Sequence, residues 1–229
     1  MLIHPTTNNI LAFSTTRDGR LEHPVPHKLL MPTHQVHGTR TAIIDQDFLQ
    51  LTDLEQALHL HGVDALATDI PNICIAVKTA DCIPILLYNE RETVISAVHA
   101  GWKGTVQRIL ERHIDLLTST YAVDPSRLHA VIGPGISPDS FEVGDEVYEA
   151  FRQADFPMND IAQRHEKWHI DLWQANRLQL TAKGLRAENI HTAGIDTLTN
   201  ENYYSARRMK TCDGRIINGI LIKTEASCK

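Results

Sequence analysis

The sequence predicts an α/β fold, a mixed sandwich in which helices pack against a sheet. Strand-like segments fill the centre of the chain, helical spacing follows them, and strands return near the C-terminus. The resulting order, β-β-β-β-α-β-α-α-β-β-β, departs from the regular alternation of a parallel βαβ fold. No low-complexity linker and no repeat of fixed period divides the 229 residues. We therefore expect one domain over residues 1–229.

Four strands are predicted in the centre of the chain. The segments 63–68, 73–79, 83–88 and 93–100 are rich in β-branched and apolar side chains. The polar segment 89–92 has the composition of a turn between the last two strands. We expect these strands to be neighbours in one sheet.

Three helices are predicted in the second half of the chain. The first begins after Gly104, has its apolar residues on one face and ends before Pro125. The second covers residues 143–154. The third is the best marked, because Asp171 can cap its first turn and Gly184 can supply the left-handed residue that ends it.

The remaining strands flank these helices. One is expected at residues 128–132, where the Gly-Pro-Gly sequence at 133–135 stops it. That sequence lacks the context of a phosphate-binding loop, so we interpret it as a turn. Three C-terminal strands are expected at residues 190–195, 203–208 and 216–223.

Composition and charge exclude several classes of protein. Hydrophobic residues make up 42% of the chain and charged residues 22%, as in ordinary globular proteins. The net charge of −6, from 22 Lys+Arg and 28 Asp+Glu, argues against an extended nucleic-acid interface. The longest strongly apolar run, residues 83–88, is far shorter than the ~20 residues of a membrane-spanning helix.

The N-terminal segment and the cysteines predict a cytoplasmic protein. The first residues have no basic segment followed by an apolar one, as a signal peptide would. The four cysteines, at positions 74, 82, 212 and 228, form no CxxC pair. They are too few to staple a chain of this size, which indicates buried thiols or a metal ligand.

Three short segments bring together side chains that can bind a metal ion. Cys82 opens one predicted strand and His99 closes the next, so they meet at one sheet edge if these strands are antiparallel neighbours. His34 or His37 would complete a His₂Cys set with an open position, the composition of a catalytic zinc site. The alternative interpretation is two histidines beside the core and an inert thiol.

A second motif, HEKWH at residues 165–169, matches the HExxH pattern of zinc proteases. That pattern requires both histidines in one helix, but the Asp171 cap places a helix start two residues later. No third ligand follows. We interpret the motif as a surface segment leading into a helix, and we expect His165 and His169 to point in different directions.

The other histidines are weaker candidates for ligands. His59 and His61 form the only HxH pair in the chain and are expected on a surface turn. His113, His129 and His191 are expected to be half-buried structural residues.

Seven segments in order resemble the bacterial laccase-domain proteins, also called the polyphenol-oxidase or peptidoglycan-editing-factor family. They are HQVHG, TADCIPILLYN, AVHAGWKGT, IGPGIS, FEVGDEV, IDLWQANRLQL and YSARR. The resemblance extends from about Phe13 to the end of the chain. It implies a single-domain α/β/α sandwich with a metal held by His37, Cys82 and His99. We expect His37 rather than His34 as ligand, because Gly38 lets the backbone pass close to the metal.

The sequence departs from the family pattern in its substrate loops. The family's STRxGG segment reads Ser-Thr-Thr-Arg-Asp-Gly-Arg at residues 14–20, with Arg17 as the equivalent arginine and without the glycine pair. Its Cys-Thr and SYRR segments read Asp-Thr at 196–197 and Ser-Ala-Arg-Arg at 205–208. The three metal-ligand motifs are intact.

The resemblance implies zinc-dependent phosphorolysis of adenosine, inosine, guanosine and methylthioadenosine, together with adenosine deamination. A His₂Cys-bound Zn²⁺ lowers the pKa of its water, and the resulting hydroxide can attack C6 of adenine. Asp81 is the candidate proton shuttle, or else a turn residue. Arg17, Lys103 and Arg207 are candidates for binding phosphate. The alternative for Lys103 is a solvated loop cation.

Three alternatives stay open. The family name suggests copper-dependent phenol oxidation, but multicopper oxidases need several HxH pairs and this chain has one. A His₂Cys site would still bind Cu²⁺ in vitro. Relatives are also linked to hydrolysis of the amide between a UDP-muramyl group and a misincorporated serine, which would use the same three ligands. Metal storage is the third alternative, and the open coordination position argues against it.

Overall fold

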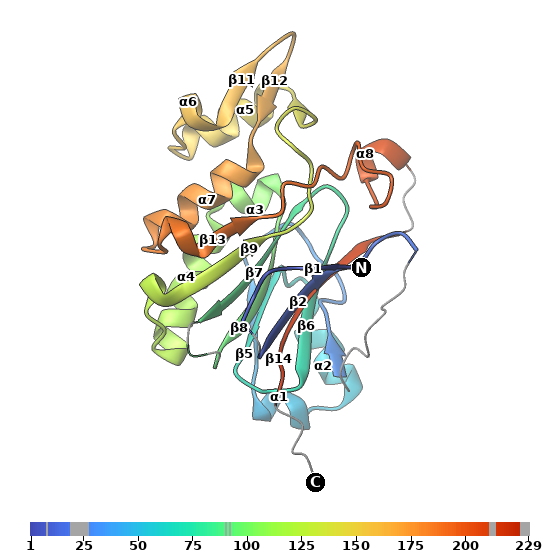
Figure 1. Ribbon diagram of the computed structural model, residues 1–229, viewed down its shortest axis with the longest axis vertical. Coiled ribbons are helices and arrows are strands. Elements are labelled where there is room, and N and C mark those ends of the chain that lie inside the picture. Colours follow the sequence, from blue (N-terminus) through green and yellow to red (C-terminus); the bar gives the residue numbers. More distant parts are fainter. Residues whose placement is uncertain (8, 19–27, 90, 92, 211–213, 225–229) are drawn as a thin grey trace.

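Two large sheets lie face to face and enclose one of the two main hydrophobic cores (Figure 1). The computed structural model describes residues 1–7, 9–18, 28–89, 91, 93–210 and 214–224. The first sheet has five strands in the order β1-β2-β14-β6-β3 and is antiparallel except for the β3–β6 pair. Its strands are β1 (Leu2–Ile3), β2 (Ile10–Ser14), β3 (Lys28–Leu30), β6 (Ile73–Thr79) and β14 (Ile216–Ile222).

The second sheet has six strands in the order β13-β9-β7-β8-β5-β4. Its central strands are antiparallel, and a parallel pair stands at each edge. The strands are β4 (Thr41–Ile44), β5 (Ala65–Thr68), β7 (Ile83–Asn89), β8 (Ile95–Ala100), β9 (Leu128–Ile132) and β13 (Ile190–Thr192).

The six-stranded sheet is buried on both faces. On β7, Leu86 and Tyr88 join the core between the two sheets, whereas Ile85 and Leu87 join the core beneath the helices. This alternation is the period-2 pattern of a strand between two layers. The mixed α/β class is thus confirmed. The layers run sheet, sheet, helix, and the five-stranded sheet stands where the predicted α/β/α order has a second helical layer (Figure 1).

The helical layer follows the sequence prediction closely. The predicted first helix is divided into α3 (Trp102–Val106) and α4 (Ile109–Tyr121), because Arg108 has a left-handed φ of 62°. The Asp171 side chain caps α7 (Leu172–Ala182) by accepting from the Gln174 N–H at 2.8 Å. Gly184, at φ 95°, follows its end as predicted.

The remaining helices are short. They are α1 (Gln46–Gln50), α2 (Asp53–His59), α5 (Asp145–Gln153), α6 (Met158–Ile161), α8 (Ala206–Met209) and the 3₁₀ turns Pro125–Arg127 and Ala187–Asn189. The capping box of α2, formed by Thr52 and Glu55, marks a helix start that the sequence analysis did not use. No helix in the described ranges has the length and apolar character that crossing a membrane requires.

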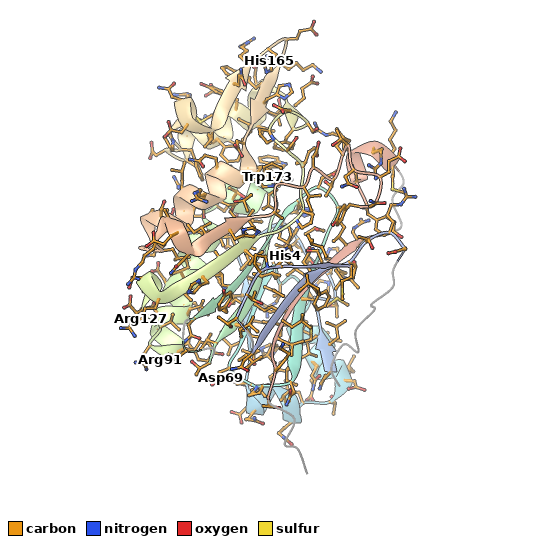
Figure 2. All side chains as sticks on the ribbon, viewed as in Figure 1. His4, Asp69, Arg91, Arg127, His165 and Trp173 are labelled. Atoms are coloured by element: carbon orange, nitrogen blue, oxygen red, sulfur yellow. The ribbon has the colours of Figure 1, made fainter. Side chains whose placement is uncertain are left out.

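The HEKWH motif lies in a small third sheet rather than in a helix. Strands β10 (Glu142–Val143), β12 (Trp168–Ile170) and β11 (Ala162–Arg164) pair antiparallel in that order. His165 lies at the tip of this sheet, at one end of the molecule (Figure 2).

Two strand predictions are wrong. β6 belongs to the five-stranded sheet, whereas β5, β7 and β8 belong to the six-stranded one. The chain crosses from one sheet to the other at residues 80–82, where Asp81 has a φ of 85°. The predicted strand at 203–208 is a loop followed by α8, because the Ser205 hydroxyl accepts from the Arg208 N–H and caps a helix.

Candidate metal centre

His37 lies in the loop that follows β3, in a left-handed conformation with φ 60°. The Asp64 carboxylate accepts from the backbone N–H groups of Val36 at 3.2 Å, His37 at 3.0 Å and Gly38 at 2.8 Å. Three bonds to one carboxylate fix this loop, so its unusual φ is held by the surrounding structure.

The side chain of Gln35 fixes the same loop from the other side. Its amide accepts from the Lys78 N–H at 2.8 Å and donates to the Lys78 carbonyl at 2.9 Å. This amide takes the place of a neighbouring strand backbone along β6, beyond the point where the β3–β6 pairing ends at Leu30.

Cys82 and His99 meet at one edge of the six-stranded sheet. Cys82 comes just before β7, and the antiparallel register pairs Pro84 with His99 on β8. The prediction that the two side chains meet at this edge is confirmed.

The ligand atoms of His37, Cys82 and His99 all lie within 4.8 Å of one another. The imidazole rings of His37 and His99 stand edge to face, with centroids 4.8 Å apart. His37 is exposed, Cys82 is partly buried and His99 is only 3% exposed. The donor set is therefore anchored in the core on one side and open on the other.

The buried Asp64 also orients His99. Its Oδ1 accepts from His99 Nδ1 at 2.8 Å, which leaves Nε2 for a metal ion. Burial alone would raise the pKa of Asp64, but hydrogen bonds from His99 and Gly38 lower it overall, so the carboxylate is ionised. A carboxylate inside the apolar segment 63–68 was the sequence signal for this role.

Without a metal ion, the electrostatics of the site favour a thiolate on Cys82 and an imidazolium on His99. Burial opposes charge on Cys82, but the positive field of His99 and hydrogen bonds from both histidines lower the thiol pKa to about 6. Burial likewise opposes charge on His99, but Cys82 and Asp64 raise its pKa to about 9. A metal ion entering the site would displace the His99 proton.

Gly101 lets the donors approach one another. A Cβ atom at this position would lie 2.9 Å from His37 Cδ2 and 3.1 Å from Cys82 Sγ. At Gly38, by contrast, a Cβ would meet its nearest atoms at 3.5 and 3.6 Å, which is ordinary contact. The close approach that we expected at Gly38 therefore occurs at Gly101. Nitrogen and sulfur donors on such a tight frame fit a metal ion of zinc or copper type.

The donors open into a pocket of about 520 Å³. His34 lines it and stacks on His61, with ring centroids 5.3 Å apart. The cations that line it are Lys78 and Arg215, which the sequence analysis missed. The signal for Lys78 was one charged residue in an otherwise apolar strand.

The predicted anion-binding residues lie elsewhere. Arg17 lies over the Tyr204 ring, with its guanidinium 5.8 Å from the centroid, and lines a separate pocket. Lys103 is exposed beside Trp102. Arg207 donates to the Glu142 carbonyl at 2.8 Å. None of these three cations lines the metal pocket.

The Asp81 carboxylate is directed toward α8 and the loop before it. Oδ1 accepts from the Thr197 hydroxyl at 2.7 Å, and Oδ2 accepts from the Arg207 N–H at 2.7 Å. Asp81 thus connects the turn that carries Cys82 to the helix whose first residue, Ala206, lines the pocket.

The HEKWH histidines contact one another, contrary to our expectation. The rings of His165 and His169 stand edge to face with centroids 5.0 Å apart, because the β11–β12 hairpin brings them together. Within the described ranges, the one group of three or more His, Cys, Asp or Glu with metal-binding geometry is His37, Cys82 and His99.

The sequence and the fold both match known proteins. A family model described as multi-copper polyphenol oxidoreductase laccase matches residues 17–223. The chain belongs to the laccase-domain family. This laccase-domain chain is 41% identical over 202 residues to a purine nucleoside phosphorylase of Bacteroides thetaiotaomicron, covering 86% of this chain and 74% of the relative. It is 43% identical over 199 residues to adenosine deaminase RL5 of an unknown prokaryotic organism, covering 85% and 75%.

Solved laccase-domain structures share the fold. YlmD from Geobacillus stearothermophilus superimposes with a TM-score of 0.81 at 25% identity, covering 95% of this chain and 93% of that one. YfiH from Bacillus licheniformis gives 0.80 at 23% identity, covering 94% of each chain. The resemblance drawn from the sequence motifs is thus confirmed.

Proposed function

We propose that the protein is a zinc-dependent purine nucleoside phosphorylase that also deaminates adenosine. The observation that carries the proposal is the His37, Cys82 and His99 donor set in the lining of the 520 Å³ pocket. That volume falls in the range of small-molecule sites. Two relatives more than 40% identical to the chain bear the names of these two activities.

The two reactions share a substrate but differ in the second reactant. Phosphorolysis breaks the N-glycosidic bond of the nucleoside with inorganic phosphate and yields the free base and ribose 1-phosphate. Deamination replaces the C6 amino group of adenosine with oxygen from water and yields inosine and ammonia. A zinc ion held by His37, Cys82 and His99 would supply Lewis acidity and lower the pKa of a bound water.

The residues of this chain prepare the site for that ion. Cys82, with its pKa lowered to about 6, brings a negative charge at neutral pH. Asp64 fixes the His99 ring and keeps Nε2 directed away from the carboxylate. The exposed face of His37 leaves the donor set accessible from the pocket.

The donor count disfavours the multicopper oxidase alternative. Multicopper chemistry requires several histidine clusters, and the described part of the chain offers one three-residue group. The single HxH pair does not supply another, because His61 stacks on His34 and the His59 ring packs 5.8 Å from Phe48.

One assay separates the candidate functions. Purified protein of known metal content is incubated with adenosine and phosphate, and in parallel with a UDP-muramyl-serine precursor. The proposal predicts release of adenine, ribose 1-phosphate and inosine, with no serine released from the muramyl substrate. Serine release without nucleoside turnover would replace the proposal by the amidase alternative.

A further inference from the structure

The metal pocket has a positively charged lining. The eleven described residues that line it include Lys78 and Arg215 and no aspartate or glutamate. The whole chain carries a net charge of −6. Two cations in the described lining of a pocket, in a protein that is acidic as a whole, favour an anionic ligand, because fixed charges raise the local concentration of the opposite sign.

The strand register places the two cations on one face. In the β6–β14 pair, Ile217 lies opposite Lys78 and Ile216 opposite Thr79. The paired register ends there, and Arg215 and Ala80, the next residue on each side, both line the pocket. Side chains alternate along a strand, so Lys78 and Arg215 are diagonal neighbours, with Cα atoms roughly 7–8 Å apart. Their long side chains can both reach one tetrahedral anion.

Lys78 is tied to the metal-binding loop. Both backbone groups of Lys78 are bonded to the side-chain amide of Gln35, two residues before His37. The strand that carries Lys78 ends at Thr79, three residues before Cys82. Lys78 is therefore held in place by the loop that carries His37, and its strand leads directly to Cys82.

We propose that Lys78 and Arg215 form a phosphate subsite at the mouth of the metal pocket. The proposal rests on the proposed function, in which a nucleoside occupies this pocket. The phosphate is inorganic phosphate, the second reactant of phosphorolysis, or a phosphate carried by the nucleoside itself. Both present the same tetrahedral oxygens to a lysine and an arginine.

The test measures binding by calorimetry on the purified protein as isolated. The probes are inorganic phosphate, adenosine and adenosine 5′-monophosphate. The variants are Lys78→Gln and Arg215→Gln, with Lys78→Arg as the charge-conserving variant. Lys223→Gln is the control, because Lys223 is exposed just after β14 and does not line the pocket.

Each neutral variant is expected to bind phosphate about tenfold more weakly, the usual effect of losing one charge-assisted hydrogen bond. Adenosine binding, and the properties of Lys78→Arg and Lys223→Gln, should stay within twofold of the parent. If adenosine monophosphate loses affinity in the neutral variants and inorganic phosphate does not bind at all, the subsite takes a phosphate on the nucleoside.

The proposal is overturned if both probes bind the neutral variants as tightly as they bind the parent. Its failure is distinguishable from failure of the proposed function. Charge-dependent phosphate binding without nucleoside turnover would support the subsite and contradict the phosphorylase activity. Nucleoside turnover with an unchanged KM for phosphate in both neutral variants would support the phosphorylase activity and contradict the subsite.

Discussion

Asp64 Oδ1 accepts a hydrogen bond from His99 Nδ1 at 2.8 Å, and both side chains are almost fully buried. The same carboxylate holds three consecutive N–H groups of the loop that carries His37. Asp64, which directly precedes β5, therefore positions two of the three candidate metal donors. Such outer carboxylates orient the ligand ring and increase its basicity.

Replacing Asp64 with asparagine should weaken metal binding by about 10- to 100-fold, the usual effect of losing such a partner. The amide keeps the shape of the side chain but loses its charge and one acceptor oxygen. Competition with a chromophoric chelator measures the affinity, and circular dichroism verifies that the variant is folded. An unchanged affinity in a folded variant would show that the carboxylate does not act on the donors.

Gly101→Ala should impair metal binding, whereas Gly38→Ala should retain it. The added methyl group at Gly101 would press on His37 and Cys82, and neither can retreat without moving a donor atom. At Gly38 the methyl group finds ordinary contact distances. Metal content per chain, measured by mass spectrometry of the ashed protein, distinguishes the pair. Equal occupancy in the two variants contradicts the close-packed frame.

Acid should destabilise the metal-free protein through His113. Complete burial lowers the pKa of this histidine from 6.5 to about 4, and its Nδ1 shares a hydrogen bond with the Thr41 hydroxyl at 3.0 Å. Because the folded pKa lies below the unfolded one, its stabilising contribution is complete above pH 6.5. The contribution is lost as the pH falls toward 4. At pH 5 the loss already amounts to about 2 kcal/mol.

Urea unfolding of the parent and of His113→Gln, at pH 7.5 and pH 5 with excess chelator, measures this contribution. Lowering the pH from 7.5 to 5 should reduce the unfolding free energy of the parent by about 2 kcal/mol relative to that of the variant. His4, whose pKa burial and His191 also lower to about 4, is present in both proteins and cancels. A difference that does not change with pH would exclude His113 as the titrating group.

Glu166→Gln should leave metal content and both activities at the parental level. Glu166 lies in the turn between β11 and β12, and the zinc-protease role requires a helix that the structure does not form there. The rings of His165 and His169 do meet, so a double variant of these two histidines is the stricter test. Loss of one equivalent of metal in that variant would show that the ion binds at the β11–β12 hairpin and would contradict the assignment of the metal to His37, Cys82 and His99.

The sequence predicts the metal donors better than their surroundings. Cys82 and His99 follow from strand pairing, which is a local property of adjacent segments. Asp64, Gln35 and Lys78 act through contacts between the two sheets and their loops, and those contacts depend on the assignment of β6 to the other sheet. No periodicity distinguishes a strand of one sheet from a strand of its neighbour, since both are apolar and alternate in the same way.

The helix prediction for the second half succeeded for the longer helices α4, α5 and α7 and failed for the four-residue helix α8. Asp171 and Gly184 mark both ends of α7, and the structure uses both. The tyrosines and arginines at 203–208 have strand-like composition, but the capping bond of Ser205 determines the local structure. Helix α8 is short and is held by one cap and by Asp81, so its few residues do not show a helical pattern from which it could be predicted.

The proposed function requires a metal ion that is held in part by Cys82. The decisive measurement follows adenosine deamination and phosphorolysis together in the parent, in chelator-treated protein and in Cys82→Ser. Serine is a poor ligand at neutral pH, so metal content and deamination should fall in parallel in the two depleted samples. Added Zn²⁺ should restore the chelated parent and leave Cys82→Ser largely inactive. Undiminished deamination by metal-free protein would contradict the account.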